Sequence, residues 1–225
     1  MASVGGPSGT GGRPLYLRQF ELGPMQNFIY LLGCPETREC AVIDPAWDME
    51  TVLRTARADD YRITHAIITH THPDHVNGLG GLLDAGGCRI HVHRAEAEFL
   101  RGLGLGQDLV PMDAGDTILV GKVPVRLLHT PGHTPGSQCF SVDDKLISGD
   151  TLFVGACGRC DLPGGDAEEM YRSLTQRLMA LPDDTVLYPG HNYGPRPSST
   201  LGDERRTNPF MRFTSLGAFL RAFGF

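Results

Sequence analysis

Apolar residues along this chain occur in short runs, and turn-forming Gly, Pro, Asn and Asp residues separate the runs. This pattern predicts many short strands. In the first half, strands are predicted over residues 15–20, 27–32, 40–43, 63–69 and 89–93, and helices over 49–58, 76–85 and 95–101. In the second half, hairpins are predicted over 116–129 and 138–148, followed by a helix over 167–180 and a strand over 185–188.

Each half of the chain places its predicted strands largely before its predicted helices. This order favours an α/β architecture in which two sheets pack together and helices cover their outer faces. Residues 1–14 are rich in Gly and Ser, which predicts a disordered tail. Residues 15–225 are predicted to form a single domain that ends in a short helical segment.

Composition and charge narrow the class of protein. Hydrophobic residues make up 40% and charged residues 20% of the 225 residues, as in ordinary globular proteins. The net charge of −6 does not favour a nucleic-acid partner. Because no apolar run has the length of a membrane span or the character of a signal peptide, we expect no membrane partner and a cytoplasmic location. The six scattered cysteines predict reduced thiols.

The densest chemistry lies in residues 69–75, which read Thr-His-Thr-His-Pro-Asp-His. In an extended segment His70 and His72 share a face, and the turn at Pro73 directs Asp74 and His75 to a second point nearby. Imidazole and carboxylate are both ligands for transition metals. Four such ligands are too many for one catalytic metal that keeps an open position, so the spacing predicts two metals.

Three later residues are candidates to complete the site. His133, Asp150 and His191 each follow a predicted strand and lie in a loop bounded by Gly or Pro. Functional side chains are commonly mounted on such loops above a rigid scaffold.

Taken in order, the motifs T-H-x-H-x-D-H, P-G-H-T-P-G, S-G-D-T-L-F and P-G-H resemble the metallo-β-lactamase superfamily. The resemblance implies a four-layer αββα sandwich with a metal site at one edge between the sheets. It also implies one metal held by His70, His72 and His133, a second held by Asp74, His75 and His191, and Asp150 bridging them. Zn²⁺ is the favoured ion at both sites, with Fe²⁺ or a mixed pair as alternatives. A metal-bridging hydroxide would then attack the substrate, with Asp74 as the catalytic residue that aligns it.

Within the superfamily, the segment 149–159, the His-Asn-Tyr at 191–193 and the Asn-Pro-Phe-Met-Arg at 208–212 resemble glyoxalase II. The resemblance implies that Arg159, Tyr193 and Arg212 contact glutathione. Arginine is independently well suited to hold the carboxylates of glutathione. The predicted activity is therefore hydrolysis of a hydroxyacylglutathione-type thioester.

Two features depart from glyoxalase II. Little chain follows Arg212, whereas that family has a longer helical C-terminal domain, and the Gly-Arg-Cys-Asp at 158–161 is similar to the G-R-x-D of persulfide dioxygenases. That resemblance implies a single Fe²⁺ held by His70, His133 and Asp150, and oxidation of glutathione persulfide. A lactonase or other ester hydrolase and a non-catalytic metal-stabilised binding module are further alternatives.

Several further residues are given no role by these motifs. Asp44 is interpreted either as a support for the metal ligands or as a carboxylate that shapes its own turn. Cys157 and Cys160 are expected to line the loop beside Asp150, and the apolar residues of 210–225 suggest a homodimer surface. The other histidines, His65, His91, His93 and His129, are interpreted as strand-end or surface residues.

Overall fold

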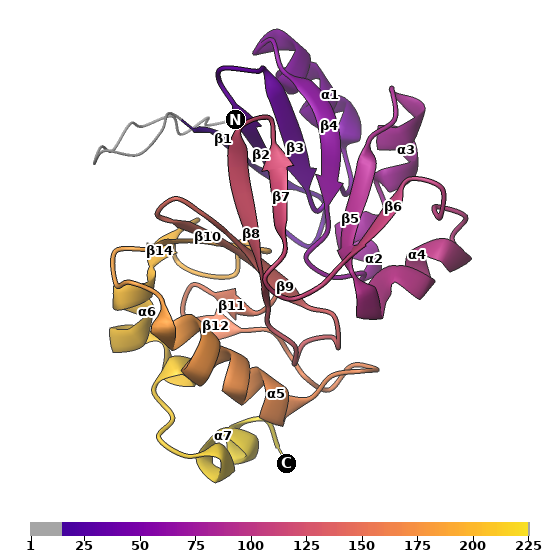
Figure 1. Ribbon diagram of the computed structural model, residues 1–225. Coiled ribbons are helices and arrows are strands. Elements are labelled where there is room, and N and C mark those ends of the chain that lie inside the picture. The colour runs from indigo at the N-terminus through magenta and orange to yellow at the C-terminus, as the bar shows by residue number, and fades with distance from the viewer. Residues whose placement is uncertain (1–14, 225) are drawn as a thin grey trace.

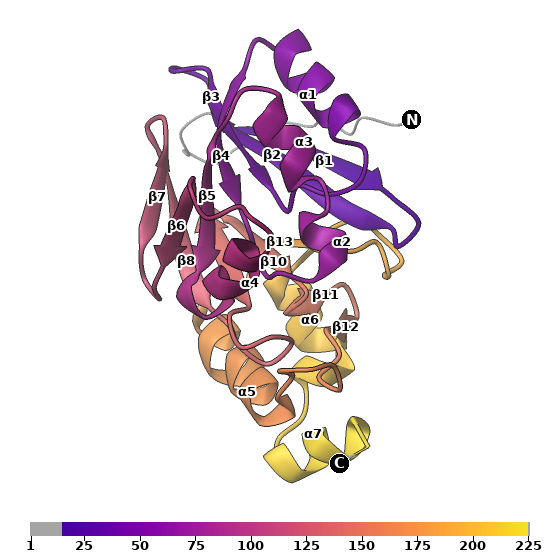
Figure 2. The same cartoon turned by 90° about the vertical axis from the view of Figure 1, so that its right-hand side faces the viewer.

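The structure is a computed structural model that describes residues 15–224 (Figure 1). The predicted disordered tail, residues 1–14, lies outside the described residues. Two six-stranded sheets pack face to face (Figures 1 and 2). The first sheet contains, in spatial order, β1 (Tyr16–Leu22), β2 (Asn27–Cys34), β3 (Glu39–Ile43), β4 (Arg62–Ile67), β5 (Arg89–His93) and β6 (Leu109–Met112). The second contains β14 (Ser199–Thr200), β13 (Val186–Pro189), β10 (Lys145–Gly149), β9 (Gln138–Val142), β8 (Val123–His129) and β7 (Thr117–Val120), and β11 (Leu152–Phe153) pairs separately with β12 (Ala156–Cys157).

Helices cover the outer face of each sheet (Figure 2). The first sheet carries α1 (Met49–Ala58), α2 (Pro73–Val76), α3 (Leu79–Asp84), η1 (Arg94–Glu96) and α4 (Ala97–Gly102). The second carries α5 (Ala167–Arg172), η2 (Ser173–Arg177), η3 (Leu178–Ala180), α6 (Leu201–Thr207), η4 (Pro209–Met211) and α7 (Leu216–Ala222). Three apolar clusters fill the spaces between the four layers. The predicted αββα sandwich is therefore confirmed.

Most predicted elements are present. The predicted helix 167–180 consists of α5, η2 and η3 in succession, and β14 was not predicted. The predicted helix 76–85 is wrong as a continuous element, because α2 ends at Val76 and α3 begins at Leu79. The break lies at Gly78, where a Cβ atom would come within 2.6 Å of Met49, so the backbone must pass close to α1. Neither β6 nor the short strand pair β11–β12 was predicted. Among the described residues, no helix is both long and apolar enough to cross a membrane.

The apolar residues near the C-terminus pack within the chain. Phe219 of α7 is fully buried, and its ring contacts those of Phe210, Phe213, Phe223 and Tyr171. Residues on α7 thereby close over α5. Phe219 is thus not exposed, although exposed apolar residues in this segment were the reason for the homodimer prediction. The homodimer itself stays a prediction.

The other histidines were interpreted as strand-end or surface residues, and this is wrong for His91, which is buried within β5, whereas His93 does end β5 but is also buried. His91 and His93 are 6% and 9% exposed. His91 Nε2 lies 2.9 Å from His65 Nδ1 on the neighbouring strand, and the ring of His93 stacks on that of His129 from the other sheet, with centroids 4.0 Å apart. Alternation along β5 places Ile90 and Val92 in the cluster beneath the helices, so the histidines point the other way, between the sheets.

These buried pairs predict acid sensitivity of the fold. Burial lowers the pKa of His91 to about 4, and neighbouring His65 and Arg89 add to this effect. Below about pH 6.5 this histidine binds a proton in the unfolded chain, whereas in the folded chain it stays neutral until about pH 4. The stability of the fold therefore decreases as the pH is lowered from about 6.5 towards 4. In melting experiments at pH 7 and pH 5, His91→Leu is expected to lose less stability on acidification than the wild type. Equal losses would contradict this assignment.

Candidate metal centre

The predicted ligands all follow the carboxyl ends of strands, and the two sheets bring these ends together. The segment Thr69–His75 follows β4, His133 follows β8, Asp150 follows β10 and His191 follows β13. Gln138 ties the sheets together at this edge, since its backbone N–H and its side-chain amide donate to the carbonyl oxygens of Thr69 and Ile68 at 3.0 and 2.7 Å. Ligands more than 100 residues apart thus occupy one region between the sheets.

One group of three side chains contains His70, His72 and His133. The Nδ1 atom of His72 lies 3.0 Å from His70 Nε2 and 2.9 Å from His133 Nε2. Three imidazole nitrogens that face one point at such separations could hold a single transition-metal ion.

A second group contains Asp74, His75 and His191. The Nε2 atoms of the two histidines are 3.1 Å apart, and each lies 3.5 Å from Asp74 Oδ2. Asp150 lies between the groups, because its carboxylate is 3.4 Å from His75, 3.5 Å from His133 and 3.3 Å from His191. The structure therefore brings all seven predicted ligands together, with Asp150 in a position to bridge.

The outer ring nitrogens determine which atoms face the centre. Nδ1 of His133 donates to the carbonyl oxygen of Arg159 at 2.7 Å, and Nδ1 of His191 donates to that of Met25 at 2.8 Å. Their Nε2 atoms are left as acceptors, which is the state that binds a metal. The Oδ1 atom of Asp150 is buried without a hydrogen-bond partner. Ring nitrogens and carboxylate oxygens that converge in this way fit a cation.

Asp44 is the main support beneath both groups. It is buried, and its carboxylate accepts from Thr69 N–H at 2.7 Å, from the Thr69 hydroxyl at 2.6 Å and from His75 Nδ1 at 2.9 Å. The Thr69 oxygen in turn accepts from His70 Nδ1 at 3.0 Å. Although Asp44 lies close enough to His70 and His75 to count as a ligand, its oxygens are already occupied by these donors. It orients the histidines, which agrees with one of its two interpretations.

The sequence did not indicate the residue that holds Asp74. Asn27, at the start of β2, donates from Nδ2 to Asp74 Oδ2 at 2.9 Å and accepts from Trp47 Nε1 at 2.8 Å. The same segment pairs with the loop of His191, since Phe28 N–H donates to Gly190 O at 2.8 Å. Asn27 stands at the start of an apolar strand, where an amide has no motif to mark it.

Electrostatics at the centre favour a cation. Burial lowers the pKa of His70 well below its usual value, and neighbouring His75 adds to this. Burial would also raise the pKa of Asp150, but His75 and His191 outweigh it and hold that pKa well below its usual range. At His75, burial is outweighed by Asp150, Asp44 and Asp74, which raise the pKa to about 9. The carboxylates thus create a negative potential that a metal ion would neutralise.

The three predicted substrate residues differ in their surroundings. The ring of Tyr193 stacks on His191 with centroids 4.5 Å apart, and 52% of the residue is exposed. The Arg159 guanidinium forms two contacts of 2.6 Å with Asp161. Arg212 is exposed after η4, and within residues 15–224 its side chain makes no hydrogen bond or ion pair with the centre. The structure thus places Tyr193 and the Arg159 backbone against the ligands, but not Arg212.

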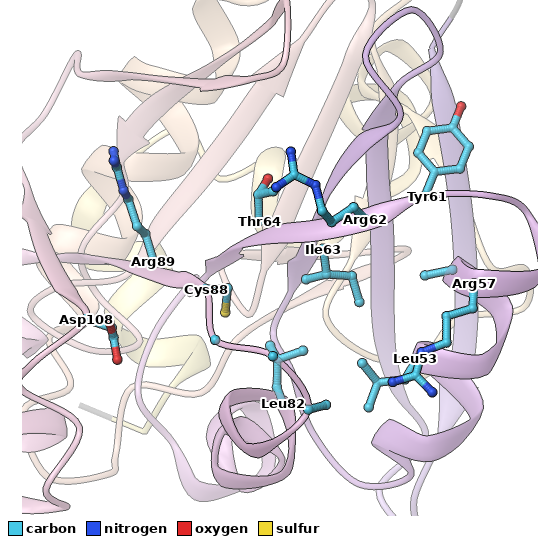
Figure 3. A pocket seen from close by; sticks show the side chains of 14 residues that line it. Leu53, Arg57, Tyr61, Arg62, Ile63, Thr64, Leu82, Cys88, Arg89 and Asp108 are labelled. Atoms are coloured by element: carbon cyan, nitrogen blue, oxygen red, sulfur yellow. The ribbon is translucent and has the colours of Figure 1, made fainter.

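One cavity lies away from the metal centre. It has a volume of about 590 Å³ and opens at the amino ends of β4 and β5, beside α1 and α3 (Figure 3). Ile63, Leu82 and Cys88 form its apolar floor, while the side chains of Arg62 and Arg89 extend away from that floor (Figure 3). The metal ligands follow the opposite end of β4, so this cavity is separate from the centre.

Comparison with known proteins agrees with the fold and the centre. The model of the metallo-beta-lactamase superfamily matches residues 22–191. The chain belongs to the metallo-β-lactamase superfamily. Members of this superfamily bind divalent metal ions, and the His and Asp cluster of this chain fits such a site.

Relatives within the superfamily carry two different activities in their names. A hydroxyacylglutathione hydrolase of Polaromonas sp. is 40% identical over 172 residues, which cover 75% of this chain and 63% of that enzyme. The human mitochondrial persulfide dioxygenase ETHE1 is 35% identical over 207 residues, covering 89% of this chain and 78% of that enzyme. The crystal structure of ETHE1 from Myxococcus xanthus superposes with a TM-score of 0.85 at 31% identity, covering 93% of this chain and 90% of that one. These comparisons establish the superfamily of the chain, but the named activities of its relatives differ.

Removal of the Asp44 carboxylate tests its role as the support. In Asp44→Asn, one acceptor oxygen becomes an amide NH₂ that faces donors, so His75 loses its fixed orientation. We expect the affinity for Zn²⁺ to fall about 10–100-fold, as for other residues that orient metal-binding histidines. Isothermal titration of metal-free protein measures this, with Asp84→Asn on the exposed end of α3 as the control. An unchanged affinity in Asp44→Asn would show that its hydrogen bonds serve the fold alone.

Proposed function

We propose that this protein is a two-metal hydrolase that cleaves a glutathione thioester of the hydroxyacylglutathione class. The observation that carries the proposal is the pair of adjacent ligand groups that share Asp150. In this assignment His70, His72 and His133 would hold one ion, Asp74, His75 and His191 would hold the other, and Asp150 would be shared between the two groups. Zn²⁺ is the first choice for both ions, with Fe²⁺ or a mixed pair as the alternative.

The reaction needs no side-chain nucleophile. Two divalent cations bound in these groups would activate a water molecule at neutral pH and polarise the thioester carbonyl. Cys157 and Cys160 are poor alternatives, because burial raises the pKa of Cys157 well above its usual value and that of Cys160 to about 12. The thiolate form of either residue is therefore disfavoured at neutral pH.

Asp74 has the position of a proton acceptor. Its carboxylate is more exposed than those of the buried ligands, with 15% of the side chain accessible, and Asn27 fixes one of its oxygens. In the proposal the Asp74 carboxylate aligns the attacking water and accepts its proton. The Asn27 amide fixes the orientation of that carboxylate.

The proposed substrate contacts are Tyr193, Arg159 and Arg212. The exposed face of Tyr193 offers an aromatic surface next to His191, and Arg159 and Arg212 offer positive charge for the carboxylates of glutathione. Because Asp161 already occupies the Arg159 guanidinium, a substrate carboxylate must replace or share that partner. The hydroxyacylglutathione hydrolase relative supports this substrate class.

Release of thiol from S-D-lactoylglutathione tests the proposal. Protein loaded with two equivalents of Zn²⁺ is expected to hydrolyse the thioester, and Asp74→Asn is expected to lower kcat by at least about 100-fold, because it removes a proton acceptor. Asp84→Asn makes the same chemical change on the exposed end of α3 and is expected to retain activity. Wild-type protein that contains two metals and releases no thiol would refute the assignment.

A persulfide dioxygenase is the second candidate. It is favoured by the Arg159–Asp161 pair in the loop that also supports His133, and by the extensive coverage of the ETHE1 relatives. This reaction would use one Fe²⁺, held by His70, His133 and Asp150.

The dioxygenase candidate predicts oxygen consumption. Iron-loaded protein given glutathione persulfide is expected to consume O₂ in an oxygen electrode, and His133→Ala is expected to abolish the uptake because it removes an iron ligand. The zinc-loaded protein serves as the control, because Zn²⁺ has no redox chemistry. A flat trace from iron-loaded wild type would remove this candidate.

A further inference from the structure

A buried carboxylate in η1 connects the two loops that supply the first ligand group. Glu96 is 6% exposed. Its Oε2 accepts from the backbone N–H of Thr71 at 3.1 Å and from the Thr71 hydroxyl, and its Oε1 accepts from the backbone N–H of Gly136 at 2.9 Å. All three partners are donors, which matches an ionised carboxylate that can only accept.

The partners of Glu96 lie close in sequence to the three histidines of the first ligand group. Thr71 stands between His70 and His72, and Gly136 lies three residues after His133. Glu96 therefore joins the loop that carries two histidines of the group to the loop that carries the third. The two loops must keep their spacing, since His72 Nδ1 and His133 Nε2 are only 2.9 Å apart.

Gly136 is the residue that lets the carboxylate reach both loops. A Cβ atom at this position would lie 2.2 Å from Glu96 Cγ and 2.9 Å from its Oε1. The glycine is thus required by close approach, and any side chain here would displace Glu96.

We propose that Glu96 is a positioning residue that sets the first metal site by clamping the loops of His72 and His133 together. This rests on the metal sites of the proposed function, but not on which reaction they catalyse. Glu96 touches neither the ligand atoms nor the substrate, and acts through Thr71 and Gly136. Its effect should therefore appear in metal affinity at one site and not at the other.

Calorimetric titration of metal-free protein with Zn²⁺ tests the clamp. Wild type is expected to bind in two steps. In Glu96→Gln, one of the two acceptor oxygens is replaced by an NH₂ group that faces another donor. The Zn²⁺ affinity of one binding step is therefore expected to weaken about tenfold. Glu98→Gln makes the same change two residues away on an exposed side chain and is expected to match wild type.

A double variant separates clamping from a general loss of structure. His133→Ala removes the first group and should leave one binding step, and adding Glu96→Gln to it is expected to change that step no further. Gly136→Ala, which displaces the carboxylate without removing it, is expected to weaken the same step as Glu96→Gln. Combining it with Glu96→Gln should add nothing, because both act on one contact.

Several outcomes would overturn the clamp. These are unchanged affinity in both Glu96→Gln and Gly136→Ala, equal weakening of both steps, or a Glu96→Gln effect that persists in His133→Ala. A wild-type protein that binds no Zn²⁺ would overturn the clamp and the two-metal proposal together. Two-step binding without thioester hydrolysis would refute the proposed substrate and leave the clamp supported.

Discussion

The convergence of metal-binding nitrogen and oxygen atoms in one buried region is the constraint on which this structure depends. Five imidazole rings and two carboxylates meet there, with separations of 2.9–3.5 Å between their nitrogen and oxygen atoms. Such an arrangement is unfavourable on its own, because buried acceptors need donors or a cation. The surrounding protein holds it together through Asp44, Asn27, Glu96 and backbone carbonyls. The region fits a divalent cation, and these supporting residues hold its nitrogen and oxygen atoms in place.

The supports also explain why the site lies between the sheets. Phe28 of the first sheet binds the loop of His191 from the second, while Gln138 of the second sheet binds the carbonyls before His70. Each sheet therefore supplies hydrogen bonds that hold a ligand-carrying segment of the other sheet. Formation of the centre and packing of the sheets are coupled, so disruption of either is expected to affect the other.

The sequence predicted the layers and the seven candidate ligands that the structure brings together, but not most of the residues that support them. The ligands were visible because His70 to His75 lie in one short segment and the distant ones sit in marked Gly/Pro loops. Glu96 and Asn27 have no such signal, since their partners lie 25 to 47 residues away and meet them only once the sheets pack. The strand β6 was missed because Pro111 interrupts a four-residue run at a sheet edge, where proline is tolerated. The paired histidines between the sheets were missed because alternation alone does not show which face of β5 is covered.

Metal content is the most direct test of the central claim that the seven residues form two metal sites. The measurement is elemental analysis of protein purified without added metal and again after reconstitution and desalting. Two divalent ions per chain are expected in the wild type, and one is expected in His133→Ala. A saturating content of one ion in the wild type, or none, would contradict the central claim.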